Sequence, residues 1–254
     1  DITQAVIRTN TIDSLMIFTN KGRMYRLLVD EIPVGTNATK GQSIKSLVAM
    51  EKDEEASIIY SIYRDTDAKY VLFTTKNGLV KKTALEEYVK TKKKTGIIAI
   101  NIREDDELVS VNLIKDEPIV ITTANGVAIQ FSSTEIGATS RATTGIKGIN
   151  LGVDDYVVST LVVRHPTDSL AVFAQNGMGK KFTLNEIPIQ KRAGKGLVCY
   201  KSTDTTGKVA AAALISDEDN ILLCGDKTGI CISATDVPAL GRASIGNQLI
   251  KNNK

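Results

Sequence analysis

The sequence predicts an all-β protein, a propeller-like ring of about five blades, each a four-stranded antiparallel sheet. Three observations carry this prediction. One pattern of apolar run, glycine turn and second strand recurs five times along the 254 residues. A second glycine follows each turn glycine after 17 to 19 residues. No long apolar stripe has helical spacing, and units of about 50 residues that stack around an axis are typical of propellers.

Each repeat is expected to begin with a β-hairpin. The first strands read LMIF, YVLF, PIVI, LAVF and ILLC, and continuous apolar runs of this kind indicate strands covered on both faces. Turns such as Asn-Gly supply the positive φ angle that joins antiparallel strands. The turn glycines are Gly22, Gly78, Gly126, Gly177 and Gly229.

The repeats define one domain over residues 1–254. Its units lie at about 14–62, 69–114, 118–163, 169–215 and 220–254. Residues 1–9 match the end of a repeat, which the fifth unit lacks. We expect Thr3–Arg8 to complete the last blade and close the ring; the alternative is truncation at an arbitrary point. Helix is expected only in residues 83–90, as about two turns.

Composition excludes several classes of protein. The chain is 42% hydrophobic and 24% charged, which is ordinary for a globular domain. No apolar run approaches the roughly 20 residues that cross a bilayer, and the start does not resemble a signal peptide. We therefore expect a cytoplasmic protein without membrane contact. Three cysteines without a CxxC motif argue against zinc or a disulfide framework, and a Cys224–Cys231 disulfide is the less favoured alternative.

No catalytic or metal site is expected in this chain. His165 is the only histidine, and its place beside Pro166 favours a surface loop. Neither a phosphate-binding loop nor a metal-ligand spacing is present. Acidic residues recur at equivalent repeat positions before strands, which favours turn formation over a unique acid–base site. These residues are Asp13, Asp105, Asp106, Asp154, Asp155 and Asp168.

The charge distribution favours a phosphate ligand more than the net charge of +3 does. Residues 76–103 hold eight Lys or Arg and two acids, whereas residues 104–117 hold six acids and one lysine. Because equivalent positions of stacked repeats fall on the same side of a ring, these clusters predict a basic stripe. Aromatic residues make up only 5%, which argues against a platform for single strands. Duplex DNA, held through its backbone and bent, is the better match.

The expected DNA contacts lie after a turn glycine or around a second glycine. We expect them to bind phosphates rather than to read bases; for any single lysine, solubility or edge protection is the alternative. The candidates are Lys21, Arg23, Arg26, Lys40, Lys45, Lys81, Lys82, Lys92, Lys93, Lys94, Arg141, Lys147, Lys180, Lys181, Gln190, Lys191, Arg192, Lys195 and Arg242.

Several strings resemble a known family. NTIDSLMIFTNKGRMYRLLVDEIP, TTKNGLVKKTALEEY, RATTGIKGINLGVDDYVVS and AQNGMGKKFTLNEIP are similar, in the same order, to blades of the C-terminal domain of the A chain of bacterial type IIA topoisomerases. DNA gyrase is the nearer match and topoisomerase IV is its sibling. The resemblance implies a β-pinwheel, a propeller whose blades exchange strands. It also implies wrapping of double-stranded DNA, presentation of a segment for strand passage, and DNA supercoiling.

The resemblance further implies that this domain has no cofactor and no catalytic residue, because ATP and Mg²⁺ act elsewhere in the enzyme. Its implied partners are the N-terminal domains of its own A-type polypeptide and the B-type polypeptide, in an A2B2 enzyme of the bacterial cytoplasm. The isolated domain is expected to be a monomer.

One motif departs from the family. The gyrase signature Q-R-R-G-G-K-G normally lies in the first blade, whereas its nearest string here, QKRAGKG at Gln190–Gly196, lies in the fourth repeat. Either a first blade is missing from this chain, or the chain is a five-bladed relative that leans towards topoisomerase IV or a degenerate gyrase. A propeller that serves as a protein-interaction scaffold remains a separate alternative.

Overall fold

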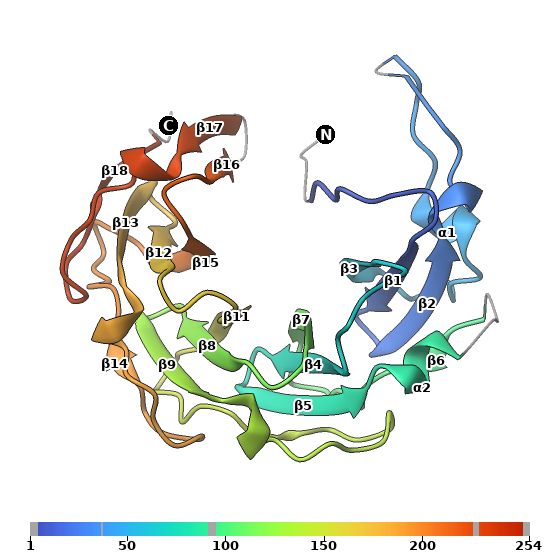
Figure 1. Cartoon of the computed structure of the whole chain (residues 1–254), viewed down its shortest axis with the longest axis horizontal. Coiled ribbons are helices and arrows are strands. Elements are labelled where there is room, and N and C mark those ends of the chain that lie inside the picture. Colours follow the sequence, from blue (N-terminus) through green and yellow to red (C-terminus); the bar gives the residue numbers. More distant parts are fainter. Residues whose placement is uncertain (1–4, 37, 91–94, 226–228, 251–254) are drawn as a thin grey trace.

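The computed structural model describes residues 5–36, 38–90, 95–225 and 229–250. Within these residues the chain forms four four-stranded antiparallel sheets and one two-stranded sheet. The sheets follow one another around an open ring, with the third strand of each repeat on the inner side (Figure 1). The chain is therefore an all-β propeller of four blades and part of a fifth.

Each repeat begins with a hairpin, as the sequence predicts. The hairpins are β1 (Ser14–Thr19) with β2 (Arg23–Leu28), β4 (Tyr70–Thr75) with β5 (Leu79–Ala84), β8 (Pro118–Thr123) with β9 (Val127–Ser132), β12 (Ser169–Ala174) with β13 (Met178–Thr183), and β16 (Asn220–Cys224) with β17 (Gly229–Ser233). A third strand pairs with the first strand in four repeats. These strands are β3 (Ala56–Ile62), β7 (Leu108–Ile114), β11 (Val157–Val162) and β15 (Val209–Ile215).

The outermost strand of each complete blade comes from the following repeat. The sheet orders are β3-β1-β2-β6, β10-β5-β4-β7, β11-β8-β9-β14 and β15-β12-β13-β18. These fourth strands are β6 (Ile97–Ile98), β10 (Ile146–Lys147), β14 (Leu197–Val198) and β18 (Asn247–Gln248). Every complete blade is thus built from two consecutive repeats, which ties each blade covalently to its neighbour.

The exchanged strand docks onto the turn glycine of the hairpin that receives it. In the third blade, the amides of Cys199 and Tyr200 donate to the carbonyl of Gly126 at 2.7 and 3.2 Å. Gly126 has φ +83°, and a Cβ atom there would lie 2.1 Å from the carbonyl oxygen of Tyr200. The position excludes any side chain because both the backbone conformation and the docked strand forbid one.

The fifth hairpin differs from the expectation. Gly229 is the first residue of β17 and pairs with Cys224, so it does not occupy the turn. Residues 226–228 lie outside the described residues. Cys224 and Cys231 are free, exposed thiols that do not face each other, since Cys231 pairs with Leu222.

The hydrophobic core lies between successive blades. All six residues of β1 are buried, as expected for a strand covered on both faces. Phe18 from the first blade packs edge-on against Phe73 of the second, with ring centroids 5.5 Å apart. Tyr88 lies beside Phe73 at 5.8 Å, so the short helix of the second repeat closes this part of the core.

Among the described residues, helix is confined to single turns that follow the second strand or the second glycine. In the second repeat α2 covers Glu86–Val89, which is shorter than the two turns expected over residues 83–90, because β5 continues to Ala84. The other short helices are η1 (Val29–Glu31), α1 (Ile44–Leu47), η2 (Ser133–Glu135), η3 (Leu184–Glu186) and η4 (Ala234–Asp236).

The N-terminal segment lies on the first blade. Residues 5–9 form no strand, and β16 pairs only with β17 among the described residues. Ile7 packs against the core of the first blade, and the Thr9 hydroxyl hydrogen-bonds to Ser61 of β3 at 2.9 Å. The described part of Thr3–Arg8 therefore does not complete the last blade, because these contacts hold it on the other side of the opening in Figure 1. Residues 3 and 4 lie outside the described residues.

We expect Gly126→Ala to destabilise the fold by more than about 2 kcal/mol, because a positive φ and a backbone clash add together. Gly137→Ala is the matched control: φ is not positive at Gly137, and a Cβ there meets nothing within 4 Å. Urea unfolding followed by circular dichroism measures both variants. Equal midpoints for the two variants would show that the strand docks without needing the glycine.

Candidate nucleic-acid interface

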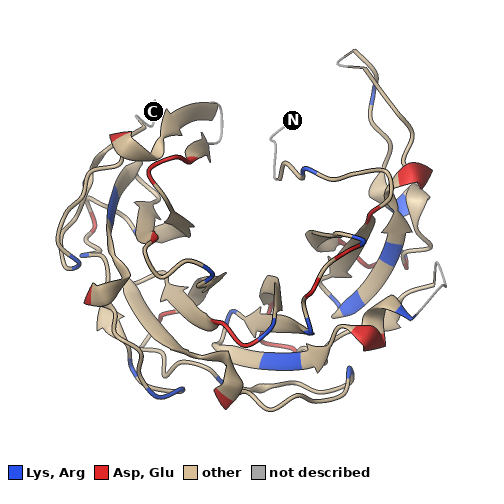
Figure 2. Cartoon of the chain, in the orientation of Figure 1, with Lys and Arg blue, Asp and Glu red and all other residues tan. Residues whose placement is uncertain are grey.

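Basic residues recur along the outer perimeter of the ring. Figure 2 shows Lys and Arg along β2, β5 and β13, in the outer loops and also in loops nearer the centre, where Asp and Glu lie beside them; other Asp and Glu lie in the short helices. Each outer loop leads from a short helix to the second glycine and the exchanged strand. The outer perimeter is therefore where repeated cations come together.

The fourth and third repeats supply a compact group of exposed lysines. Lys147 lies on β10, and Lys191 and Lys195 lie in the loop that precedes β14; all three are exposed. The guanidinium of Arg192 donates to the carbonyl oxygen of Lys147 at 2.5 Å, so this loop lies directly against β10. Three ammonium groups from two repeats thus share one stretch of the perimeter.

In the third, fourth and fifth repeats one arginine covers the free edge of an exchanged strand. Arg141 donates to the Ile98 carbonyl of β6 at 3.2 Å, and Arg192 makes the equivalent bond to β10. Arg242 donates to the Val198 carbonyl of β14. These edge carbonyls carry partial negative charge, so a guanidinium that covers them turns a surface repulsive to anions into an attractive one.

A glutamate on the preceding short helix fixes each arginine loop. The Arg192 amide donates to the Glu135 carboxylate at 3.1 Å, and the Arg242 amide donates to Glu186 at 2.9 Å. In the second repeat Glu87 lies 3.9 Å from the Arg141 guanidinium. This role of the glutamate was not predicted, although an acidic residue recurs at the end of each helix string, as in DEIP, STEIG and LNEIP.

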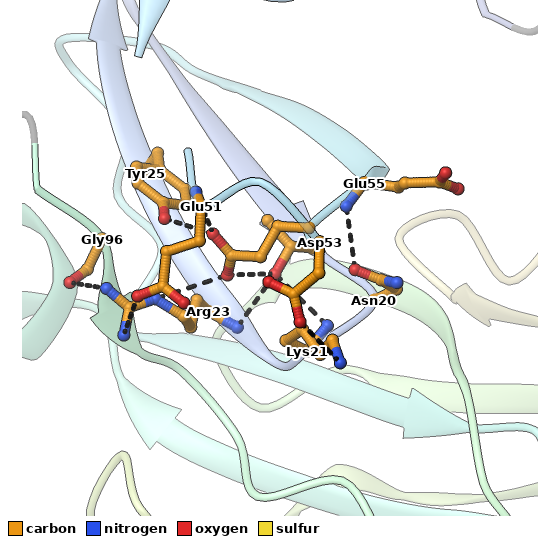
Figure 3. A network of polar contacts seen from close by, with 10 residues as sticks. Asn20, Lys21, Arg23, Tyr25, Glu51, Asp53, Glu55 and Gly96 are labelled. Carbon is orange, nitrogen blue, oxygen red and sulfur yellow. Dashed lines mark hydrogen bonds and ion pairs between the residues drawn. The ribbon is translucent and has the colours of Figure 1, made fainter. Parts of the chain in front are cut away.

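In the first repeat, Lys21 and Arg23 form ion pairs with carboxylates (Figure 3). Lys21 lies 3.2 Å from Asp53, and Arg23 lies 3.6 Å from Glu51 and 3.3 Å from Glu54. The Lys21–Asp53 pair is exposed, so it contributes little to stability and a phosphate can compete for it. Arg23 is held more firmly, since it is half-buried and also donates to the Gly96 carbonyl at 2.9 Å.

Glu54 is the centre of this network. It is fully buried and accepts hydrogen bonds from the hydroxyls of Tyr25 and Thr19 and from the Glu51 amide. Burial raises the pKa of Tyr25, and its hydrogen bond to the Glu54 carboxylate raises that pKa further. Arg23 thus balances a buried charge, which makes it a poor phosphate ligand.

Three predicted phosphate contacts are buried. Lys81, Lys82 and Lys180 are 1%, 6% and 0% exposed, so their assignment as direct phosphate contacts does not fit the structure. Lys81 donates to the Ala99 carbonyl at 2.9 Å, and Lys180 donates to the Gly241 carbonyl at 2.8 Å. Both ammonium groups tie hairpins to loops rather than facing solvent.

Two further candidates face the next blade. Arg26 donates to the Val89 carbonyl at 2.8 Å, and Lys181 donates to the Ala234 carbonyl at 2.9 Å. In contrast, Lys40 and Lys45 are exposed in the first repeat. Gln190 is half-buried, and its main-chain amide donates to Gln130 at 2.8 Å. The remaining candidates, Lys92, Lys93 and Lys94, lie outside the described residues.

The QKRAGKG string adopts a strained backbone at one residue. Ala193 has φ +64°, a conformation that favours glycine, and it stands where the family signature has glycine. Its amide donates to the Gly148 carbonyl at 2.8 Å, which holds this loop against the preceding exchanged strand.

Three of the recurring acids accept hydrogen bonds from main-chain amides of other segments. Asp106 accepts from the Asn77 amide and Asp155 from the Asn125 amide, each at 2.9 Å, which fixes the residue before the turn glycine. Asp13 accepts from the Arg64 amide at 3.0 Å. His165 is exposed. Within the described part of the chain, no group of three His, Cys, Asp or Glu side chains is arranged to hold a metal ion, and no helix has the length and apolar character needed to cross a bilayer.

Blades that exchange their outer strand and carry an arginine-covered, basic perimeter define a β-pinwheel, a form of β-propeller. The chain belongs to the family of the DNA gyrase C-terminal domain, a β-propeller, whose model matches residues 13–57, 69–115, 117–164, 168–216 and 229–254.

Relatives over the whole chain agree with this assignment. The DNA gyrase A protein of Lawsonia intracellularis is 36% identical over 99% of this chain and 31% of its own length. The DNA gyrase A protein of Clostridium acetobutylicum is 36% identical over 100% of this chain and 30% of its own length. The chain thus spans about a third of the length of these relatives.

Two solved structures share the fold across nearly the whole chain. The crystal structure of the C-terminal domain of DNA topoisomerase IV has a TM-score of 0.84 at 31% identity, covering 96% of this chain and 76% of that one. The structure of a DNA gyrase A C-terminal domain has a TM-score of 0.85 at 27% identity, covering 96% of this chain and 80% of that one.

We expect Lys81 and Lys180 to raise the stability of the fold between about pH 8 and pH 10.5, against a smaller opposite effect of Cys199, whose thiol pKa burial raises to about 12. Burial lowers the pKa of Lys81 and Lys180 to about 8, from 10.5 for an ordinary lysine. Between these values the unfolded chain binds more protons than the folded chain, so the free energy of unfolding rises with pH. Below about pH 8 the full cost of the two buried charges is present.

Urea unfolding at about pH 7.5 and about pH 9.5 measures this rise. The Lys81→Met, Lys180→Met double variant should lose most of it. A double variant that gains as much stability as the original chain over this interval would refute the assignment to these lysines.

We expect Ala193→Gly to stabilise the fold by about 0.5–1 kcal/mol, because relief of the positive φ outweighs the added freedom of the unfolded chain. Ala142→Gly, in the equivalent loop of the third repeat without a positive φ, is the control and should be slightly destabilising. Thermal unfolding compares the two variants. A loss of stability in Ala193→Gly would mean that the strain is absent.

Proposed function

We propose that this domain binds duplex DNA through phosphates along its outer perimeter and bends the duplex around the ring. The observation that carries the proposal is the repeated edge: one arginine per repeat covers an exchanged strand at the same position in three successive repeats. Contacts that recur at equal structural positions suit a ligand with repeating charge. A curved row of such contacts holds a bent duplex.

The proposed contacts are the accessible cations of the outer loops. The exposed lysines carry the electrostatic attraction, and the half-buried arginines offer donors that their carbonyl partners leave free. The set consists of Lys40, Lys45, Arg141, Lys147, Lys191, Arg192, Lys195 and Arg242. Lys21 joins it if a phosphate displaces Asp53, whereas the buried lysines do not belong to it.

Binding of this kind is expected to tolerate most sequences. The set contains cations on loops and strand edges, without a helix or ribbon of the size that enters a major groove. Phosphate contacts position a protein without identifying bases. Sequence preference would then arise only from how readily a duplex bends.

At the level of the whole protein, we propose that the domain is the non-catalytic, DNA-wrapping part of the A-type polypeptide of a type IIA topoisomerase in the bacterial cytoplasm. The relatives named as DNA gyrase A proteins support the gyrase assignment, in which wrapping favours DNA supercoiling. The likeness to a topoisomerase IV domain supports the alternative, decatenation. ATP, Mg²⁺, the B-type polypeptide and the N-terminal domains of the A-type polypeptide would act outside this domain.

Titration with duplexes of increasing length, at several salt concentrations, tests the proposal. Affinity should rise with length until the perimeter is filled, and log K should fall with log salt by roughly 0.9 for each phosphate contacted. Fluorescence anisotropy of labelled duplexes measures both quantities. Affinity that is independent of length and salt would favour a protein-interaction scaffold instead.

A further inference from the structure

Three of the basic residues at the blade boundaries occupy one structural position. Arg26, Lys82 and Lys181 each lie four residues after a turn glycine, on the second strand of a hairpin. Their hairpins belong to the first, second and fourth blades. All three were expected to bind phosphate, yet each donates to a main-chain carbonyl instead.

Each of these cations reaches a main-chain carbonyl in the short helix of the following repeat. The Arg26 guanidinium donates to Val89 in α2 at 2.8 Å. The Lys82 ammonium donates to Ser133 in η2 at 3.1 Å. The Lys181 ammonium donates to Ala234 in η4 at 2.9 Å. The same bond therefore crosses three blade boundaries.

Burial keeps Lys82 and Lys181 from an external ligand, whereas Arg26 is half-buried. Lys82 is 6% exposed, and its ammonium lies 4.7 Å from the centre of the Tyr70 ring. The Lys181 side chain is 11% exposed and also pairs with Asp217 at 2.7 Å. Arg26 divides its donors between Val89 and the Ser14 hydroxyl. Charged donors on carbonyls in such surroundings are stronger than neutral ones.

Main-chain hydrogen bonds at the same residues also cross the blade boundaries. The Thr139 amide donates to the Lys82 carbonyl at 2.8 Å, and the Leu240 amide donates to the Lys181 carbonyl at 3.0 Å. In the third blade the equivalent residue is Gln130, which accepts from the Gln190 amide at 2.8 Å. No hydrogen bond from the Gln130 side chain crosses that boundary among the described residues. At Lys82 and Lys181, the side chain and the main-chain carbonyl of one residue therefore both bond to the next repeat. The boundary between the third and fourth blades lacks the charged side-chain bond.

We propose that Arg26, Lys82 and Lys181 are positioning residues that fix the angle between successive blades and so set the curvature of the outer surface. A bond at the junction of two rigid sheets controls their relative rotation, because a small shift there moves the outer edge by a larger distance. The link to DNA bending rests on the proposed function. The link to the shape of the free domain does not.

The test compares two triple variants with the same change in charge. Arg26→Met, Lys82→Met, Lys181→Met removes the boundary bonds; Lys147→Met, Lys191→Met, Lys195→Met removes exposed cations. Small-angle scattering of the free protein gives its radius of gyration. Anisotropy gives the salt slope of DNA binding, and fluorescence transfer between the duplex ends gives the bend.

The boundary triple should change the radius of gyration and reduce the bend while the salt slope stays constant. The outer triple should keep the shape and lower the slope by about 2.7, which is about 0.9 for each lysine. A boundary triple with unchanged shape and a slope lowered by a similar amount would overturn the proposal. If the original chain fails to bind DNA, the proposed function fails, but scattering still decides the positioning role.

Two further variants cover the case in which the boundary triple does not fold. Lys82→Arg keeps a charged donor and should restore the shape that Lys82→Met alone loses. Gln130→Lys places a donor at the boundary that lacks one, near the first residue of η3, and should raise Tm by about 2–4 °C. Failure of both outcomes would also overturn the proposal.

Discussion

The fold depends on one close approach, the amides of an exchanged strand on the carbonyl of a turn glycine. At Gly22, Gly126 and Gly177, a Cβ atom would lie about 2 Å from a carbonyl oxygen of the arriving strand. The glycine therefore does more than allow a tight turn: it leaves the space in which the next repeat docks. Because the fourth strand comes from the neighbour, no complete blade can form from one repeat, and the order of the blades follows from the order of the sequence.

Strand exchange also determines what the cations do. It creates a two-residue outer strand whose carbonyls have no further strand to pair with, and Arg141, Arg192 and Arg242 cover them. Deeper in the second and fourth blades, lysines donate to carbonyls of the adjoining repeat, whereas the outer loops keep the ammonium groups of Lys147, Lys191 and Lys195 in solvent. The exposed cations of the outer loops are the ones that suit phosphate. Carboxylates such as Glu135 and Glu186 hold the arginine loops through main-chain amides, so they organise the basic edge without cancelling its charge.

The sequence predicts the hairpins and the blade order because turn glycines and apolar runs have local causes. It does not separate Lys81 and Lys180 from Lys147. Alternation along a strand assigns residues to one face or the other, but in a ring of stacked sheets both faces are covered, so burial depends on the neighbouring blade. The prediction that Gly229 is a turn glycine was wrong because the sequence near a turn does not show whether a glycine lies in the turn or begins the next strand. The position of residues 5–9 depends on contacts with Ser61 and the first core, which no local pattern reports.

The exchange of strands also affects how the domain unfolds. A propeller with self-contained blades can lose one blade and keep the rest, whereas here the removal of any repeat strips an edge from the blade before it. Cooperativity is then transmitted along the chain from neighbour to neighbour, as in a one-dimensional array with strong coupling. Opening should begin at the hairpin β16–β17, where Leu222 is 54% exposed, and advance inward. Amide hydrogen exchange would then display a gradient of protection around the ring rather than independent units.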